Sequence, residues 1–513
     1  MESLADIQDY DEEFNVQNPK KCQLSLKMIL GILFLIIIAI VVIIIIVILS
    51  SSSDNDEKKK DGGDDSINII KAKYYIEESN KIKIINDPYD KLNIQIFIDE
   101  KQDPLNFVTE YKFPNLGNHS ITFKFKEEIT NLSSLFSSCT NLIEIDFSSV
   151  NKNFIKSMNN LFYGCSSLQK VNFGDLNTSN VENMASMFDG CTSIKEINLK
   201  NFDTSKVTSM ETMFQDCKSL ISLDLQGFNT KNVINMESMF ARCYNLDKIN
   251  INSFDLTNTI KASSMFFLCK SLKEVSLKND GGNSSPIDMN GMFEKCNSLT
   301  NVDLTKFERK KIGKIQYMFY ECANLKSIDT TKFDTSESTN FYGLFKGCSS
   351  LTSLDLSQIN TEKVTIMNSI FSDCTSIKFL DLSNWSTPKL KSIISMFYNC
   401  NSLKWVKMDK FNTSIVDTMQ FMFENCYALE AIDLSMFDTR NVNNIRACFK
   451  DCKSLVDIDL SNFNGSKIDS FRCQEMFKTS GPKAKIKYNP NIIGKFVENE
   501  IPETWERINK SIN

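Results

Sequence analysis

"MASMFDGCTSIKEINLKNFDTSKVTSMETMFQDC", residues 184–217, ends with the same pattern with which it begins. Two methionines, a phenylalanine and a cysteine return after 26 residues: Met184, Met187, Phe188 and Cys191 come back as Met210, Met213, Phe214 and Cys217. A pattern that returns at one fixed spacing indicates a repeat architecture.

The cysteines show how far the repeat extends. Thirteen cysteines, called here the ladder cysteines, follow one another at steps of 26 with a single step of 27 between Cys269 and Cys296: Cys139, Cys165, Cys191, Cys217, Cys243, Cys269, Cys296, Cys322, Cys348, Cys374, Cys400, Cys426 and Cys452. A degenerate fourteenth unit contains Met476 and Phe477, with Ser480 in the cysteine place. A period between about 20 and 50 residues is typical of a solenoid or a propeller.

The interior of one unit predicts its local structure. Apolar residues alternate at Ile194, Ile197 and Leu199, which favours a short strand buried on one side. Phe202 anchors a corner, and Asp203, Thr204 and Ser205 are typical of turns and helix starts. Apolar residues then recur at helical spacing: Val207, Met210, Met213, Phe214 and Cys217. We therefore expect each unit to contain a strand, a turn and a short helical segment.

A period of 26 residues is too short for the four strands of a propeller blade, so we expect a solenoid. The predicted fold class is α/β: a leucine-rich-repeat-like solenoid with one short parallel strand and one short helical segment per coil, after a single transmembrane helix. Strands lie about 4.8 Å apart, whereas helices need about 10 Å. The array should therefore curve with the strands on its concave face, which we expect to be the working surface.

The unit M-x-x-M-F-x-x-C-x-S-L-x-x-L-D-L-S-x-F-D-T-S-x-V resembles the repeats of BspA-like leucine-rich-repeat surface proteins of bacteria and protists. The resemblance covers about residues 130–480. It implies a cell-surface protein that mediates adhesion or ligand binding rather than an enzyme.

The segments on either side of the repeats complete the predicted domain organisation. The parts are a short cytoplasmic tail at 1–27, a transmembrane signal anchor at 28–49, a polar linker at 50–65, a β-rich N-terminal cap at 66–130, a solenoid of about 14 coils at 131–480 and a C-terminal cap at 481–513. Caps are expected because an open solenoid end would expose the core.

Residues 28–49 are 22 uncharged and almost wholly apolar positions, about 33 Å long as a helix. This run is longer than the apolar core of a cleaved signal peptide, and no small-residue cleavage site follows it. We expect an uncleaved signal anchor of a single-pass membrane protein, with the C-terminal region extracellular and the plasma membrane as its location.

Composition and charge limit the classes of function that we expect. The net charge of −6 and the pI of about 5.3 offer no basic surface for nucleic acid. The single histidine, His119, lies outside the repeats, and no phosphate loop or metal motif is present, so we expect neither an enzyme nor a cofactor. The expected partners are the membrane and extracellular proteins or glycans. The alternative is a passive structural coat protein without a specific ligand.

One stretch of the predicted strand face departs from the repeat. Five residues after the ladder cysteine, where most units carry Ser, Glu, Lys or Asn, two adjacent coils carry Phe379 and Trp405. Lys378 and Lys404 lie beside them, and Lys407 replaces the usual aspartate. Exposed aromatic residues with basic neighbours are typical of binding hot spots, although a covering loop would make the same rings part of the packing. Trp385 occupies the corner-phenylalanine place and is expected in the core.

Seven residues after the ladder cysteine, acidic or amide side chains recur: Asp146, Asp224, Asp303, Asp329, Asp355, Asp381, Asp433 and Asp459, with Asn172, Asn198 and Asn250. Stacked carboxylates repel, so either a cation such as calcium lies between them or their oxygens accept hydrogen bonds in turns. The turn interpretation is favoured.

The ladder cysteines are expected to pack as buried thiols, because residues stacked about 4.8 Å apart lie too far apart at Cβ for disulfides. Zinc is disfavoured because paired cysteine spacings are lacking. Two cysteines off the ladder, Cys448 and Cys473, could form a disulfide between the last coils or be two more core thiols. Cys22, next to the predicted span, could be palmitoylated or remain an ordinary thiol.

Two further features are an insertion in one coil and a set of glycosylation sequons. Between Cys269 and Cys296 the extra residue falls in KNDGGNSSPID, where glycines and a proline predict a bulging loop. N-glycosylation sequons begin at eight asparagines: Asn118, Asn131, Asn177, Asn283, Asn384, Asn412, Asn464 and Asn509. A chain so rich in Asn and Ser contains about this many by chance, so the sequons permit glycosylation without demonstrating it.

Overall fold

The computed structural model describes residues 68–87, 93–150, 155–281 and 285–509. The chain divides into two units, Met1–Asp65 and Ser66–Asn513, and all described residues belong to the second. The predicted tail, transmembrane helix and linker lie outside the described residues, as does Cys22. Within the described ranges, no helix is both long enough and apolar enough to cross a bilayer.

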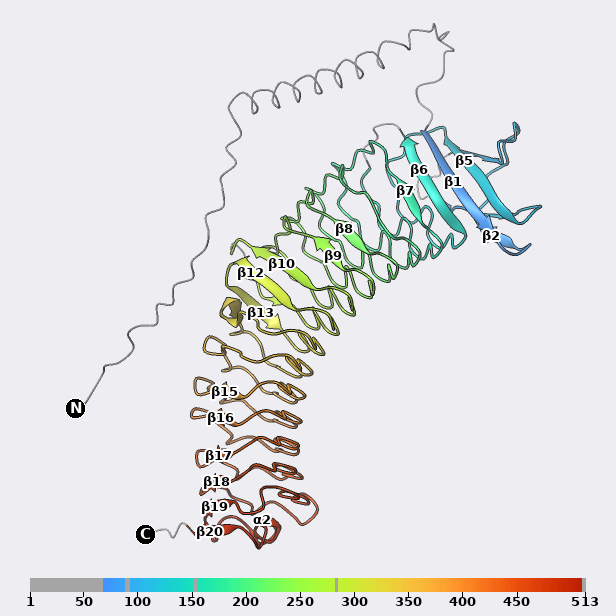
Figure 1. Cartoon of the computed structure of the whole chain (residues 1–513). Coiled ribbons are helices and arrows are strands. Elements are labelled where there is room, and N and C mark those ends of the chain that lie inside the picture. Colours follow the sequence, from blue (N-terminus) through green and yellow to red (C-terminus); the bar gives the residue numbers. More distant parts are fainter. Residues whose placement is uncertain (1–67, 88–92, 151–154, 282–284, 510–513) are drawn as a thin grey trace, which may run out of the picture. The chain divides into compact units, whose positions relative to one another are not determined.

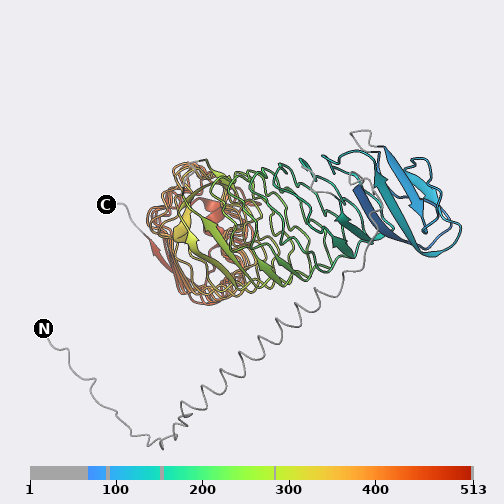
Figure 2. The same ribbon diagram turned by 90° about the horizontal axis from the view of Figure 1, so that it is seen from above.

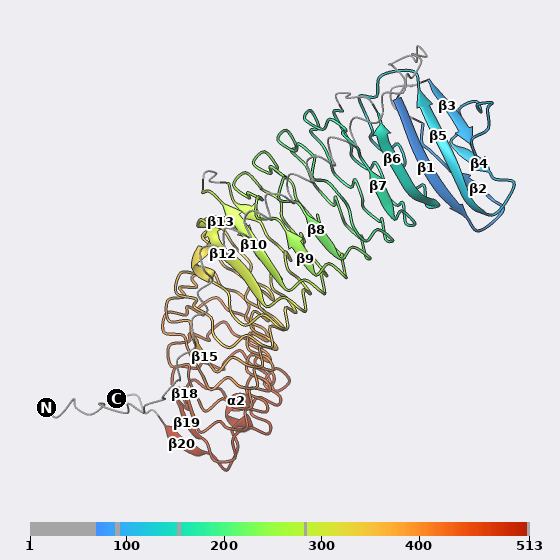
Figure 3. The same cartoon turned by 45° about the horizontal axis from the view of Figure 1, so that its top comes forward.

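The N-terminal part of the second unit is a sheet that joins the first coils. Its strand order is β3-β5-β1-β6-β7, and a separate pair, β2-β4, lies beside it (Figure 3). The bounds are β1 Asn68–Ile76, β2 Lys81–Lys83, β3 Ile94–Ile98, β4 Glu110–Lys112, β5 Gly117–Phe125, β6 Leu142–Ser149 and β7 Lys170–Asn172. Strand β1 pairs antiparallel with β6, the strand of the first coil, and so covers the open end of the solenoid.

The rest of the unit is a stack of coils whose strands pair in parallel (Figure 1). In the regular coils a strand residue pairs with the residue 26 positions on, for example Glu144 with Lys170 and Ser222 with Lys248, whereas the offset differs around the extra residue and at the C-terminal end. The strands are β8 Ser222–Asp224, β9 Lys248–Asn250, β10 Glu274–Asn279, β11 Ile287–Asp288, β12 Asn301–Phe307, β13 Lys310–Lys314, β14 Phe333–Asp334, β15 Phe379–Asp381, β16 Trp405–Lys407, β17 Ala431–Asp433, β18 Asp457–Leu460, β19 Lys485–Tyr488 and β20 Glu506–Asn509. Positions in a coil are counted below from its ladder cysteine, so Trp405 is at +5.

The predicted helical segment of each coil is wrong. The described residues form a β-solenoid of about 13 turns and are about 2% helical. The helices of the described residues are a 3-10 turn, η1 (Thr330–Lys332), and one short α-helix, α2 (Lys495–Glu500), in the C-terminal cap. The α/β fold class is therefore replaced by an all-β coil.

Consecutive turns take the place of the expected helix. In the coil of Cys217, the N–H groups of Met213, Gln215 and Cys217 donate to the carbonyl three residues before each, at 3.0–3.2 Å, and not four residues before as in an α-helix. Thr212 and Asp216 adopt positive φ angles of 49° and 55°, which interrupt any helix. The same positions, −5 and −1, are left-handed in most coils.

The remaining N–H groups of this segment bond to the next coil. Those of Met210, Thr212, Phe214 and Asp216 donate to carbonyls of the following coil at 2.8–2.9 Å. The turn side of the solenoid is thus held coil to coil by backbone hydrogen bonds, as the strand side is. Because no helical column widens this side, the reason given above for a concave strand face does not hold.

The core is a set of columns that run through all coils. The phenylalanines at −3 stack with ring centroids 5.1–6.2 Å apart: Phe136, Phe162, Phe188, Phe214, Phe240, Phe266, Phe293, Phe319, Phe345, Phe371, Phe397, Phe423, Phe449 and Phe477. Phe123 of β5 closes the column at one end, and Trp505 closes it at the other. Figure 2 shows the cap sheet at one end of the stacked coils.

A buried polar network lies near the coil that carries the extra residue between Cys269 and Cys296. The Lys310 ammonium group is only 2% exposed and donates to the Thr257 carbonyl at 2.5 Å, and burial lowers the pKa of Lys310. Asn279, also buried, donates to the Glu308 carbonyl at 2.9 Å. Residues 282–284 of the predicted bulging loop lie outside the described residues. Lys310 was not predicted to be buried.

Candidate binding surface

The aromatic pair lies on the strand face as the repeat register predicts. Phe379 of β15 pairs directly with Trp405 of β16, and the two side chains are 48% and 44% exposed. Their ring centroids are 5.2 Å apart and the rings are tilted by 37°. The alternate residues Leu380 and Val406 are buried, so the backbone pleat fixes both rings on the outer face. No described loop covers either ring to the point of burial.

Two of the three lysines beside the rings, Lys404 and Lys407, are engaged in ion pairs that were not predicted from the sequence, and Lys378 is exposed. The Lys404 ammonium lies 2.8 Å from a Glu430 carboxylate oxygen, and that of Lys407 lies 3.0 Å from Asp409. The hydrogen bond and the charge of Asp409 raise the pKa of Lys407. Lys404 and Glu430 both occupy position +4 of adjacent coils, so comparing coil positions would have revealed that pair. The surface is therefore rich in charges but close to neutral.

Trp385 is buried, as predicted. It is 1% exposed and stacks on Phe411 with ring centroids 6.4 Å apart. The indole N–H donates to the Leu356 carbonyl at 3.4 Å. Of the tryptophans in the repeats, Trp405 is thus the one available to a ligand.

The acidic and amide side chains at +7 form turns. The Asp381 carboxylate accepts the backbone N–H of Ser383 at 2.9 Å, and hydrogen bonds from Ser383 lower the pKa of Asp381. Where an asparagine follows an aspartate, its amide donates to the carboxylate: Asn172 to Asp146 and Asn250 to Asp224, both at 3.0 Å. These bonds place the +7 side chains in turns, as the turn interpretation predicted. In the described part of the chain, no three His, Cys, Asp or Glu side chains are grouped to hold a metal ion.

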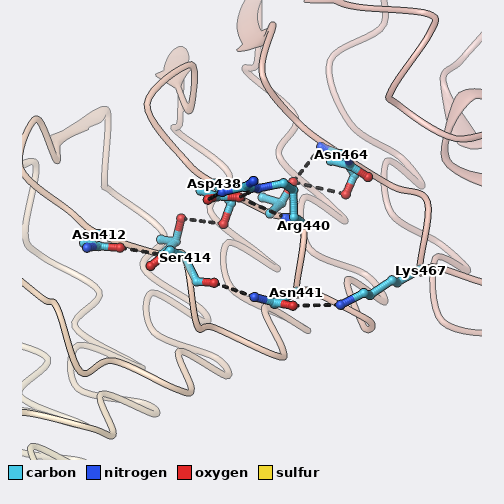
Figure 4. A network of polar contacts seen from close by, with 9 residues as sticks. Asn412, Ser414, Asp438, Arg440, Asn441, Asn464 and Lys467 are labelled. Atoms are coloured by element: carbon cyan, nitrogen blue, oxygen red, sulfur yellow. Dashed lines mark hydrogen bonds and ion pairs between the residues drawn. The ribbon is translucent and has the colours of Figure 1, made fainter.

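The next corner of the coil carries a second network, shown in Figure 4. At +12, Asn412 accepts the N–H of Ser414 at 3.0 Å, and Arg440 binds Asp438 through its side chain. At +15, Asn441 donates to the Ser414 carbonyl, and Lys467 donates to Asn441, both at 2.7 Å. This corner is thus tied from coil to coil by side chains.

Comparison with known families now adds to this geometry. Four overlapping stretches, residues 130–223, 190–285, 287–404 and 376–487, match the sequence model of a family described as "Mycoplasma protein of unknown function, DUF285", and together they cover more than half of the chain. The chain belongs to the DUF285 family. The DUF285 matches begin and end close to the first and last coils, so the repeat itself carries the family membership. No curated protein matches the chain.

The ladder thiols of the DUF285 coils are all buried, as predicted. The twelve from Cys165 to Cys452 also have a hydrogen-bonding role that was not foreseen. The Cys217 thiol donates to the Phe188 carbonyl of the preceding coil at 3.3 Å, and the same bond recurs along the ladder. In the last coil the Ser480 hydroxyl makes this bond to the Phe449 carbonyl. The ladder position therefore requires a small donor.

The two cysteines off the ladder are described as free, buried thiols. The Cys473 thiol donates to the Ser470 carbonyl at 3.7 Å. Burial raises the pKa of Cys473 to about 11. The disulfide between Cys448 and Cys473 remains a prediction.

The predicted sequons differ in their exposure. Asn118, Asn384, Asn412 and Asn509 are exposed, whereas Asn131, Asn177 and Asn464 are half-buried, and Asn283 lies outside the described residues. Three of them, Asn177, Asn412 and Asn464, occupy position +12, where asparagine makes a sequon when serine follows two residues later. At this corner the side-chain oxygen accepts a backbone N–H, which leaves the amide nitrogen as the atom for a glycan.

Proposed function

We propose that this DUF285 protein is a surface protein that binds an extracellular ligand, and so mediates adhesion, through the strand face of its solenoid. The observation that carries the proposal is the exposed pair Phe379 and Trp405, two large aromatic side chains on a face whose equivalent positions are polar except for Ala431. Large aromatic residues are enriched among residues that dominate binding energy.

The family supports this role without specifying it. DUF285 membership supports a repeated solenoid, and we propose that the coils are of the BspA-like surface type, for which adhesion is expected. A solenoid presents long, regular faces whose outer residues vary without changing the core. Such a face suits binding better than catalysis.

We also propose that the protein is not an enzyme. The ladder thiols are poor nucleophiles, because burial raises their pKa, to about 12 at Cys139. Both ring nitrogens of His119 already have partners: Nδ1 lies 2.8 Å from Asp99, and Nε2 lies 2.8 Å from the Asn115 carbonyl. These residues serve the fold of the described part.

Membrane attachment with the repeats outside the cell belongs to the same proposal. The apolar run at 28–49 supports it. Antibodies against the repeats should stain intact cells, and the protein should stay in the membrane fraction after carbonate extraction at high pH. Staining only after permeabilisation would contradict a surface location.

Cells displaying the full-length chain test the binding itself. They should adhere to host cells or to a matrix coating, and Trp405→Ala should weaken that adhesion at least about tenfold. Met436→Ala is the matched control, because Met436 is an apolar side chain that is 68% exposed and lies at +10 of the next coil rather than at +5. Adhesion that is absent, or equal in wild type and Trp405→Ala, would indicate a passive coat protein or another face.

A further inference from the structure

The two rings offer a small, flat apolar surface rather than a groove. Phe379 and Trp405 touch each other across adjacent strands, and the next residue of the same row, at +5, is Ala431. The row then becomes charged at Asp457. The apolar area is therefore limited to two side chains and a methyl group.

Charged groups surround this area on both sides. Lys378, Lys404 and Glu430 follow one another at +4, and Asp381 and Lys407 follow one another at +7. The centres of protein–protein interfaces are depleted in such residues and bury about 800 Å² per partner over about 20 to 30 residues. A patch of two rings bordered by lysines and carboxylates does not have that composition.

The surface fits a smaller ligand group with one apolar face and a polar edge. A pyranose sugar presents C–H groups on one face, which pack on an aromatic ring, while its hydroxyls project around the rim. Carboxylates accept and lysines donate hydrogen bonds at that rim. Because Lys404 and Lys407 are already paired with Glu430 and Asp409, the site offers little free positive charge for an anionic polymer.

We propose that the ligand of this face is a neutral glycan, with a sugar ring stacked on Trp405 and Phe379 and its hydroxyls bound by Asp381, Lys378 and Lys407. The inference rests on the proposed function, since it names the class of ligand for the same surface. The charged residues around the rings and the small apolar area favour a glycan over a protein partner.

Tryptophan fluorescence gives a direct test on the full-length protein in detergent. Of the three tryptophans, Trp385 and Trp505 are 1% and 4% exposed, so a change of emission on ligand addition reports on Trp405. The probes are neutral hexasaccharides of glucose, mannose, galactose and N-acetylglucosamine, with heparin as the anionic comparison. We expect a blue shift with at least one neutral probe, no shift in Trp405→Phe, and affinity about tenfold lower in Phe379→Ala. Met436→Ala should bind as wild type does.

A second measurement separates the two proposals. Adhesion of cells displaying the chain should be lost when the target surface is treated with periodate, which oxidises the diols of sugars. Trp405-dependent adhesion that survives periodate, or a response to heparin alone, overturns the glycan inference and leaves the binding function standing. Adhesion that never depends on Trp405, together with unchanged emission for all probes, overturns both.

Discussion

At the scale of the residue, the ladder cysteine is chosen for its size and its weak donor. Each ladder thiol fills a fully buried position, and those from Cys165 to Cys452 donate to a phenylalanine carbonyl of the preceding coil. A cysteine is apolar enough to be buried at little cost in free energy. Its S–H group donates a second hydrogen bond to a carbonyl that already accepts one backbone N–H. The column explains why the spacing is so regular.

Replacing one thiol should show how much packing and how much the hydrogen bond contribute to stability. Cys296→Ala removes the bond from Cys296 to the Phe266 carbonyl at 3.0 Å and leaves a small void, so the free energy of unfolding should fall by about 1–3 kcal/mol. Cys296→Ser keeps a donor, as Ser480 does naturally, and should lose less. Urea denaturation followed by circular dichroism measures the difference. Equal losses in the two variants would show that the hydrogen bond contributes nothing.

The thiols also predict a loss of stability at alkaline pH. Burial raises the pKa of the Cys139 thiol from 9.0 to about 12, and the other ladder thiols shift in the same direction. The unfolded chain therefore releases protons that the folded chain keeps, so the stabilisation is complete below pH 9 and is lost as pH rises from 9 toward about 12. The urea midpoint should fall between neutral pH and about pH 11. The slope should be smaller in Cys296→Ala, and a flat profile would contradict the assignment.

At the scale of the element, the sequence predicted the strand, the corner and the register but not the turns. Apolar residues three and four apart face one side of a helix. They also face inward in a series of consecutive β-turns, so spacing alone does not distinguish a helix from such turns. A usable signal was present at −1, where Gly190, Asp216, Asn399 and Asn425 tolerate positive φ. The ring pair followed from the register, whereas its ion pairs needed side-chain geometry.

Glycine substitution distinguishes a turn from a helix. Ser238, at −5, has a φ of 53°, so Ser238→Gly should leave stability unchanged or raise it by up to about 1 kcal/mol, and Ser238→Val should lower it by about 1–2 kcal/mol. In a helix, glycine would be the destabilising change. Ser263, where φ is not positive, is the control, and Ser263→Gly should be destabilising. Thermal melts of the three variants measure the order.

At the scale of the molecule, the described unit is a stack in which each coil contacts its neighbours through the same bonds. Stability of such an array is close to a sum over coils and their interfaces, and the two caps close the columns. The Phe column runs from Phe123 to Trp505 without leaving the core. The fold therefore requires that successive coils stay in register, and it does not depend on the length of the chain.

Removal of one whole coil tests this directly. Deletion of residues 192–217 joins Cys191 to Lys218 and keeps every column in register, so the shortened chain should fold with an unchanged far-ultraviolet spectrum. Its denaturant slope should be slightly smaller, since less surface is buried. Deletion of half a coil, residues 192–204, would place strands against turns and should prevent cooperative unfolding. Equal behaviour of the two deletions would contradict the solenoid.

The one-coil register has a consequence for how such a gene can change. Misaligned exchange between two copies inserts or removes an intact layer, because each layer offers the same hydrogen-bonding edge above and below. Interior residues are constrained because each packs in a column of equivalent residues. The exposed residues at +5 make no core contacts and are free of that constraint. The fold can therefore be kept while the exposed residues change. Related proteins with the same solenoid can then differ in the ligands that they bind.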